Sequence, residues 1–113
     1  MVLLKKETQR NPTYKETVMA GYIIAQIKVN DPEPYKDYVN QNTELVEKFG
    51  GKFLVRGGDP EVMEGEFPLP RTIVLEFPNV EAAYKWYNSP EYAGPKSLRQ
   101  ATADTNLMIV DGV

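Results

Sequence analysis

The chain has 113 residues and a net charge of −3, which fits a single domain and gives no indication of the basic face that nucleic-acid binding requires. It contains neither cysteine nor histidine, which excludes disulfides, cysteine-ligated metals, and catalysis or haem ligation by histidine. No apolar run approaches the roughly 20 residues of a membrane span, so we expect neither a nucleic-acid partner nor a membrane partner.

Residues 1–18 are interpreted as separate from the folded domain, which we expect to span residues 19–113. The segment is basic, whereas the rest of the chain is acidic. Its apolar stretch Val2-Leu3-Leu4 is too short for the core of a signal peptide, so we expect a cytoplasmic protein. The segment is either an extension outside the core, which includes the case of an upstream start codon, or an arm that packs on a partner subunit.

The first strand is predicted at residues 22–29, where apolar side chains alternate with a mixed set. A helix should follow, because Asp31 can cap it, Pro32 suits its first turn, and apolar residues then recur at helical spacing as far as Phe49. Gly50 supplies the left-handed residue that ends this helix.

A short apolar strand at residues 52–56 lies between two glycine pairs and ends at Arg56. The pair Gly50-Gly51 ends the preceding helix, and the pair Gly57-Gly58 lets the backbone turn sharply beside Arg56. Residues 61–66 are predicted to return as a short extended segment before a loop that contains two prolines.

The third strand covers residues 71–77 and alternates between an apolar face and a mixed face that carries Glu76. Asn79 can cap a helix over residues 80–88. This helix would cover the same side of the sheet as the first one.

Ser89 caps a second helical segment, in which Pro90 takes the first position. Gly94-Pro95 should weaken or bend that segment before it resumes over residues 96–103. The last strand is predicted at residues 106–111.

The predicted order is strand, helix, strand, strand, helix, strand. This is the ferredoxin-like α+β arrangement, a four-stranded antiparallel sheet with its helices on one face. The other face would carry apolar residues interrupted by Gln26, Arg56 and Glu76, and so much exposed apolar area is unusual for a monomer. We therefore expect a homodimer whose sheets pack face to face. The apolar residues assigned to this face are Tyr22, Ile24, Leu54, Val74, Met108 and Val110.

Several motifs in order give the chain a resemblance to a bacterial family of domains of unknown function, family 1330, within the dimeric α+β barrel superfamily. The resemblance covers residues 20–113 and implies a homodimer with packed sheets, but no activity. Relatives in the superfamily include cofactor-free monooxygenases, isomerases of the muconolactone type, haem-degrading enzymes and stress-response proteins. The motifs that carry it are Gly21-Tyr22, Asp31-Pro32 with Tyr35 and Tyr38, the stretch from Gly50 to Gly58, Glu64-Gly65, Val74-Leu75-Glu76-Phe77-Pro78, Ala82-Ala83 with Trp86-Tyr87, Ser89-Pro90-Glu91-Tyr92 and Leu98-Arg99.

Arg56 is the strongest candidate for a ligand-binding or catalytic residue. Its guanidinium stays charged and can hold a carboxylate or an enolate through two hydrogen bonds, and the adjacent glycines would let a ligand approach the backbone. The alternative is an ion pair with Glu76 that only satisfies the dimer interior. If the protein is an enzyme, Glu76 or a tyrosine would act as the base.

Trp86, Tyr87 and Tyr92 surround the Ser89-Pro90 corner and are candidates for lining a small-molecule cleft. Ordinary core residues are the alternative. Ser89 is interpreted as a helix cap, because no histidine is present to activate it as a nucleophile. The acidic residues lack the spacing of a metal site, so we expect no metal and no cofactor.

Two functional hypotheses follow. The first is a small-molecule-binding barrel that acts as a cofactor-free monooxygenase or isomerase on a small aromatic, quinone-like or carboxylate compound. The second is a non-catalytic dimeric barrel, which serves as a stress-associated or ligand-binding module. Fold-level analogy does not decide between them.

Overall fold

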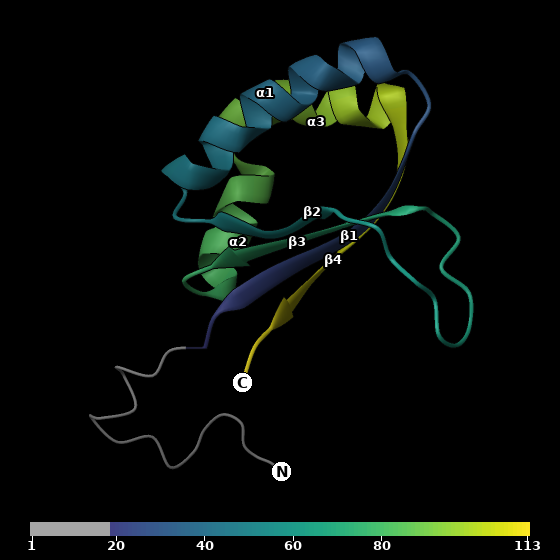
Figure 1. The fold of residues 1–113 in the computed structure, drawn as a ribbon. Helices are drawn as coiled ribbons and strands as arrows, with labels where there is room; N and C mark the ends of the chain where they lie inside the picture. The colour runs from purple at the N-terminus through teal and green to yellow at the C-terminus, as the bar shows by residue number, and fades with distance from the viewer. Residues whose placement is uncertain (1–18) are drawn as a thin grey trace.

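The computed structural model describes residues 19–113, so the predicted extension at residues 1–18 lies outside the described residues. One antiparallel sheet has the strand order β2-β3-β1-β4 (Figure 1). With β1 and β3 in the centre, this is the predicted ferredoxin-like topology. The strands are β1 (Gly21–Val29), β2 (Lys52–Gly57), β3 (Arg71–Phe77) and β4 (Ala103–Asp111).

Three helices cover one face of the sheet (Figure 1). They are α1 (Pro32–Lys48), α2 (Val80–Asn88) and α3 (Pro90–Thr102). Two predicted caps are confirmed: the Asn79 side chain accepts a hydrogen bond from the backbone N–H of Ala82 at 2.7 Å, and the Ser89 hydroxyl accepts one from the N–H of Tyr92 at 3.1 Å. Gly50 has φ 86°, as a left-handed helix stop requires.

Four local predictions are wrong. Asp31 occupies the N-cap position of α1, but its side chain makes no capping hydrogen bond. Helix α3 runs through the buried Pro95, so it does not stop at Gly94-Pro95 and resume at residue 96. Strand β4 begins directly after α3 at Ala103, three residues before the predicted position, and residues 58–70 form no strand.

The core lies between the helices and the face of the sheet that the alternation pattern predicted. Strand β1 buries every second side chain, and Phe77, Trp86 and Tyr92 are each at most 1% exposed. Burial of one such large apolar side chain contributes about 1.5–3 kcal/mol. The core residues of the strands are Ile23, Ala25, Ile27, Leu75, Phe77 and Ala103, and those of the helices include Tyr35, Tyr38, Val46, Ala83, Trp86 and Tyr92.

A β-bulge in β2 changes the direction of the side chains that follow it. Phe53 pairs with Leu75, but the next pair is Val55 with Val74, so one residue is inserted at Leu54. Arg56 then pairs with Ile73 and leaves the sheet on the helix-covered side. The prediction that Arg56 lies on the open face is therefore wrong, because unbroken alternation does not survive an inserted residue.

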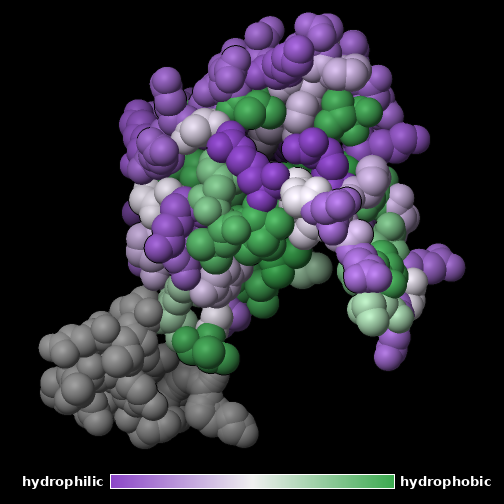
Figure 2. All heavy atoms as spheres, in the orientation of Figure 1, coloured by the Kyte–Doolittle hydropathy of each residue, from purple (hydrophilic) through white to green (hydrophobic). Residues whose placement is uncertain are grey.

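The open face of the sheet is apolar, as predicted, and exposes Leu54, Val55, Met108 and Val110 by 39% to 58%. Figure 2 shows hydrophobic residues gathered over the sheet, whereas hydrophilic residues cover the outside of the helical layer. Residues 58–70 project from the end of the sheet between β2 and β3 (Figure 1).

Within residues 19–113 no helix is both long enough and apolar enough to cross a membrane.

Candidate functional site

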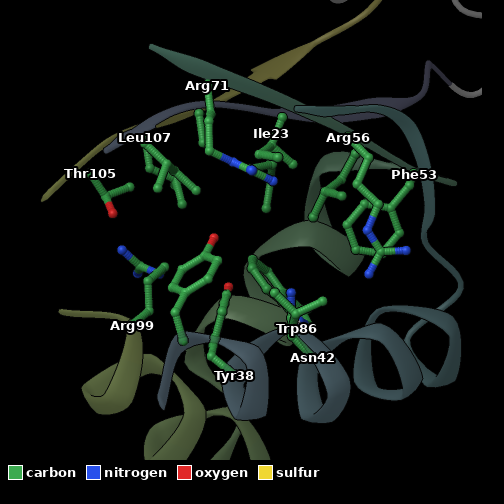
Figure 3. A pocket seen from close by; sticks show the side chains of 16 residues that line it. Ile23, Tyr38, Asn42, Phe53, Arg56, Arg71, Trp86, Arg99, Thr105 and Leu107 are labelled. Carbon is green, nitrogen blue, oxygen red and sulfur yellow. The ribbon is translucent and has the colours of Figure 1, made fainter. Parts of the chain in front are cut away.

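A cavity of about 70 Å³ lies between the helical layer and the sheet (Figure 3). Apolar side chains of the sheet line one side, and aromatic and polar side chains of the helices line the other. Among its lining residues Arg56 and Arg71 are exposed and Phe53 is partly exposed, so the cavity reaches the surface beside them. The sheet contributes Ile23, Ala25, Ile27, Ile73, Leu75 and Leu107, and the helices contribute Tyr35, Tyr38, Val39, Asn42, Trp86 and Arg99.

Three arginines from three different elements border this cavity: Arg56 at the end of β2, Arg71 at the start of β3, and Arg99 in the last turn of α3 (Figure 3). No aspartate or glutamate is among the lining residues. In the described part of the chain, the ion pairs join other residues and leave all three arginines without an acidic partner. The cavity therefore concentrates positive charge although the chain as a whole is acidic.

Arg56 stands at the mouth of the cavity. Its Nη2 donates to the hydroxyl of Thr43 in α1, and its guanidinium carbon lies 4.1 Å from the centre of the Phe53 ring. These contacts hold the charge over the gap between β2 and α1, because a cation over an aromatic face is attracted to the ring.

Glu76 lies on the opposite face of the sheet from Arg56. Its carboxylate accepts a hydrogen bond from the Tyr22 hydroxyl at 3.0 Å and lies 3.3 Å from Nζ of Lys52. The predicted ion pair between Arg56 and Glu76 is absent from the described structure, and Glu76 does not line the cavity. A joint catalytic role for these two residues in one site is therefore not supported by their positions.

A buried hydrogen-bonded chain forms the helical wall. Nε of Arg99 donates to the Tyr92 hydroxyl at 3.3 Å, and the Tyr92 hydroxyl lies 2.9 Å from that of Tyr38. Burial, together with the neighbouring Tyr92, raises the pKa of Tyr38 well above its usual range, so its hydroxyl stays protonated. Burial opposes the charge of Arg99, but its interactions with Tyr92, Tyr38 and Tyr87 together raise the pKa of the guanidinium.

All three arginines influence the ionisation of one group, the hydroxyl of Tyr35. Burial raises the pKa of its hydroxyl, while the charges of Arg71, Arg99 and Arg56 each oppose that rise. Three guanidinium groups therefore favour negative charge at the same location. Among the described residues, the Tyr35 hydroxyl makes no side-chain hydrogen bond with another group.

The three aromatic candidates occupy different positions. Trp86 lines the cavity and donates from Nε1 to Oδ1 of buried Asn42 at 3.0 Å. Tyr92 is completely buried behind the cavity wall and stacks on Trp86 with ring centres 4.2 Å apart. Tyr87 faces a separate surface groove, and Lys96 covers its ring at 4.2 Å. Only Trp86 and Arg56 of the five predicted site residues border the same cavity.

The family model described as "Domain of unknown function (DUF1330)" matches residues 20–113. The chain belongs to this family. A comparison with curated proteins found no significant match. The DUF1330 domain thus coincides with the part of the chain that folds into the sheet and its helices.

Solved structures similar to this DUF1330 chain share its fold. RPA0582, a protein of unknown function from Rhodopseudomonas palustris, is 17% identical with a TM-score of 0.70 and covers 93% of this chain and 95% of its own. SnoaB, a cofactor-independent oxygenase from Streptomyces nogalater, is 9% identical with a TM-score of 0.58, over 85% and 95%. A dimeric ferredoxin-like protein of unknown function from Thermobifida fusca is 11% identical with a TM-score of 0.52, over 96% and 100%.

Arg71 and Arg99 line the cavity but were not predicted from the sequence as residues of the site. Arg71 is two and four residues before Ile73 and Leu75 in β3, so it lies on the same face of the strand as these core residues. The alternation pattern therefore predicted a charged residue on the core face. Arg99 follows Tyr92 by seven residues, which places a charged residue on the buried stripe of α3. A charged residue on an apolar face was the signal in both cases.

Proposed function

We propose that the protein binds a small organic anion, namely an aromatic, quinone-like or carboxylate compound, in the cavity between its helices and its sheet. The observation that carries this proposal is the convergence of Arg56, Arg71 and Arg99 on a cavity without a carboxylate among its lining residues. An arginine side chain cannot shed its charge at accessible pH, so it needs a partner or water. Arg99 is only 4% exposed. Its buried charge has little contact with water, so an anionic partner stabilises it most.

The dimensions of the cavity indicate how such a ligand lies. A cavity of roughly 150 Å³ takes a benzene molecule, and the enclosed space here is about 70 Å³. The anionic group therefore occupies the enclosed end, close to Arg99 and Tyr38. The body of the ligand extends toward the mouth, between Phe53 and Arg56, where apolar and cationic surfaces both suit an aromatic acid.

The catalytic form of this proposal is cofactor-independent oxygenation or isomerisation. No carboxylate lines the cavity, and the raised pKa of Tyr38 opposes a role for it as a base. The substrate must then be acidic enough to ionise with the help of the arginines alone. In oxygenation, an activated CH2 group loses a proton and reacts with dioxygen. That carbon supplies all four electrons, so the products are one carbonyl group and one water.

The alternative is a ligand-binding barrel without catalysis, and the absence of a carboxylate among the lining residues favours it. The enzyme and the non-catalytic barrel would use the same anion site. A binding experiment therefore tests this site but does not distinguish the two forms. Consumption of one dioxygen per substrate, lost when an arginine of the cavity is replaced, would select the oxygenase.

The proposed assembly is a homodimer that joins the open faces of two sheets. The exposed apolar residues of β2 and β4 support it, as does the dimeric ferredoxin-like relative of the same fold. Pairing buries side chains that would otherwise form an unusually large apolar patch. It leaves the helix-covered cavity of each subunit intact.

The binding proposal is tested by calorimetric titration with benzoate and with benzamide, its neutral analogue of similar shape. Benzoate should bind and benzamide should not. Arg71→Met and Arg99→Met should each weaken benzoate binding roughly tenfold or more, the usual loss for a hydrogen bond to a charged group. Lys36→Met is the matched control, because Lys36 pairs with Glu33 on the exposed side of α1. Equal binding of benzoate and benzamide, or no binding of either, would refute the proposal.

A further inference from the structure

The hydrogen-bonded chain from Arg99 through Tyr92 to Tyr38 links a buried charge to the cavity. Arg99 and Tyr38 both line the cavity (Figure 3), whereas Tyr92 lies behind them and is completely buried. The Tyr92 oxygen has two side-chain hydrogen-bond partners in the described structure, Nε of Arg99 at 3.3 Å and the Tyr38 hydroxyl at 2.9 Å.

The donor and acceptor roles in this chain follow from the chemistry of its members. A guanidinium N–H can only donate, so the Tyr92 oxygen accepts from Arg99. The Tyr92 proton is buried and needs an acceptor, and within residues 19–113 the acceptor in reach is the Tyr38 oxygen. Tyr92 therefore donates to Tyr38. Donation from a charged group strengthens this second bond, because bonds in a chain polarise one another.

Tyr38 is left with its own proton uncommitted. Its oxygen accepts from Tyr92, its side chain borders the cavity, and no other side-chain hydrogen bond to it is present in the described residues. Burial and the neighbouring Tyr92 raise its pKa, so the proton stays in place. The hydrogen-bonded chain thus ends in the polarised O–H group of Tyr38, which is available to donate to a ligand in the cavity.

We propose that Tyr38 donates this hydrogen bond to a single anionic oxygen of the ligand, which makes the site selective for phenolates and enolates. This inference rests on the proposed function, because it requires an organic anion in the cavity. A phenolate or enolate oxygen carries its charge on one atom and gains from every donor that converges on it. Tyr92 and Arg99 act behind Tyr38 as positioning residues, since they fix the direction of its proton.

Because Tyr38 would stabilise a phenolate oxygen, we predict that the site lowers the pKa of a bound phenol. The probe is 4-nitrophenol, whose phenolate absorbs visible light, so its ionisation is read directly in the complex. With the wild-type protein in excess, the pKa of bound 4-nitrophenol should lie below that of the free compound. A role of Tyr38 in packing alone would not produce this shift.

Three variants distinguish the effect of this hydrogen-bonded chain from the effect of the other residues that line the cavity. Tyr38→Phe should weaken binding of the phenolate roughly tenfold and raise the pKa of the bound phenol toward its free value. Tyr92→Phe should have a smaller effect in the same direction, because Tyr38 keeps its proton but loses its orientation. Tyr84→Phe is the matched control, since it makes the same change at an exposed position of α2 that does not line the cavity.

The outcomes distinguish this inference from the function on which it rests. If wild-type protein binds 4-nitrophenolate and benzoate, but Tyr38→Phe leaves the pKa of the bound phenol unchanged, the role of Tyr38 is wrong and the anion site stands. If wild-type protein binds neither, both proposals are wrong. Should Tyr38→Phe fail to fold, the double variant Tyr38→Phe/Tyr92→Phe replaces it, because it leaves no buried hydroxyl proton without an acceptor.

Discussion

The guanidinium of Arg71 packs over the bare backbone of Gly57, where an added Cβ would lie 3.1 Å from Nη2. Gly57 also has φ 88°, a left-handed conformation that a side chain disfavours. The glycine therefore serves two purposes at once. It turns the chain at the end of β2, and it leaves room for one of the three charges of the cavity.

Gly57→Ala should lower both stability and anion affinity. The left-handed backbone costs about 1–2 kcal/mol with a side chain present, and the new methyl group displaces the Arg71 guanidinium. Chemical denaturation and benzoate titration measure the two effects. Gly58→Ala is the control, because Gly58 has φ 62° but its Cβ would meet only Val55, at 3.9 Å. Equal losses of benzoate affinity in both variants would show that Arg71 is not positioned through Gly57.

Replacement of apolar residues on the open face should produce monomers. Met108 and Val110 are 58% and 40% exposed on this face of β4, and the double change to lysine sets like charges against each other across a two-fold interface. Sedimentation at micromolar concentration should show a dimer for the wild type and a monomer for the variant. Tyr84→Lys, at an exposed position on α2, should remain dimeric. A wild-type monomer at every concentration would contradict the assembly.

The helix caps should differ in energetic importance. Ser89→Ala removes an acceptor for the N–H of Tyr92 and a donor to the carbonyl of Trp86, so the free energy of unfolding should fall by about 1–2 kcal/mol. Asp31→Ala should change it by less than about 0.5 kcal/mol, because the Asp31 side chain makes no cap bond. Urea denaturation of both variants checks this. A larger loss for Asp31→Ala would mean that its side chain caps α1 in solution.

Stability should decline at alkaline pH because of the buried tyrosines. Burial raises the pKa values of Tyr38 and Tyr35 in the folded state, whereas tyrosine in an unfolded chain ionises near pH 10. Below about pH 10 both states keep the proton and stability is constant. Above it only the unfolded chain ionises, so each such tyrosine lowers the free energy of unfolding by up to about 1.4 kcal/mol per pH unit.

Tyr38→Phe should make this alkaline decline less steep, since it removes one of the groups that ionise only on unfolding. Urea denaturation at intervals from pH 8 to pH 11 measures the slope. An identical slope in the variant and the wild type would show that the Tyr38 hydroxyl ionises as easily in the folded protein as in the unfolded chain.

The amino-acid sequence determined the elements and most of their faces, because those depend on local chemistry. Alternating side chains place Ile23, Ala25 and Ile27 on one face of β1 whatever the rest of the chain does. Asn79 and Ser89 cap their helices through neighbouring backbone groups only. The apolar open face follows from the same alternation.

The tertiary structure alone decided where the charges meet. The bulge at Leu54 turns Arg56 from the open face to the cavity, because one inserted residue reverses the parity of the strand after it. Arg71 and Arg99 are separated by 28 positions in the chain, and only the packing of the helical layer on the sheet brings both to one cavity. Strand and helix periodicity specify the face on which a residue lies, whereas proximity between faces depends on how the layers pack.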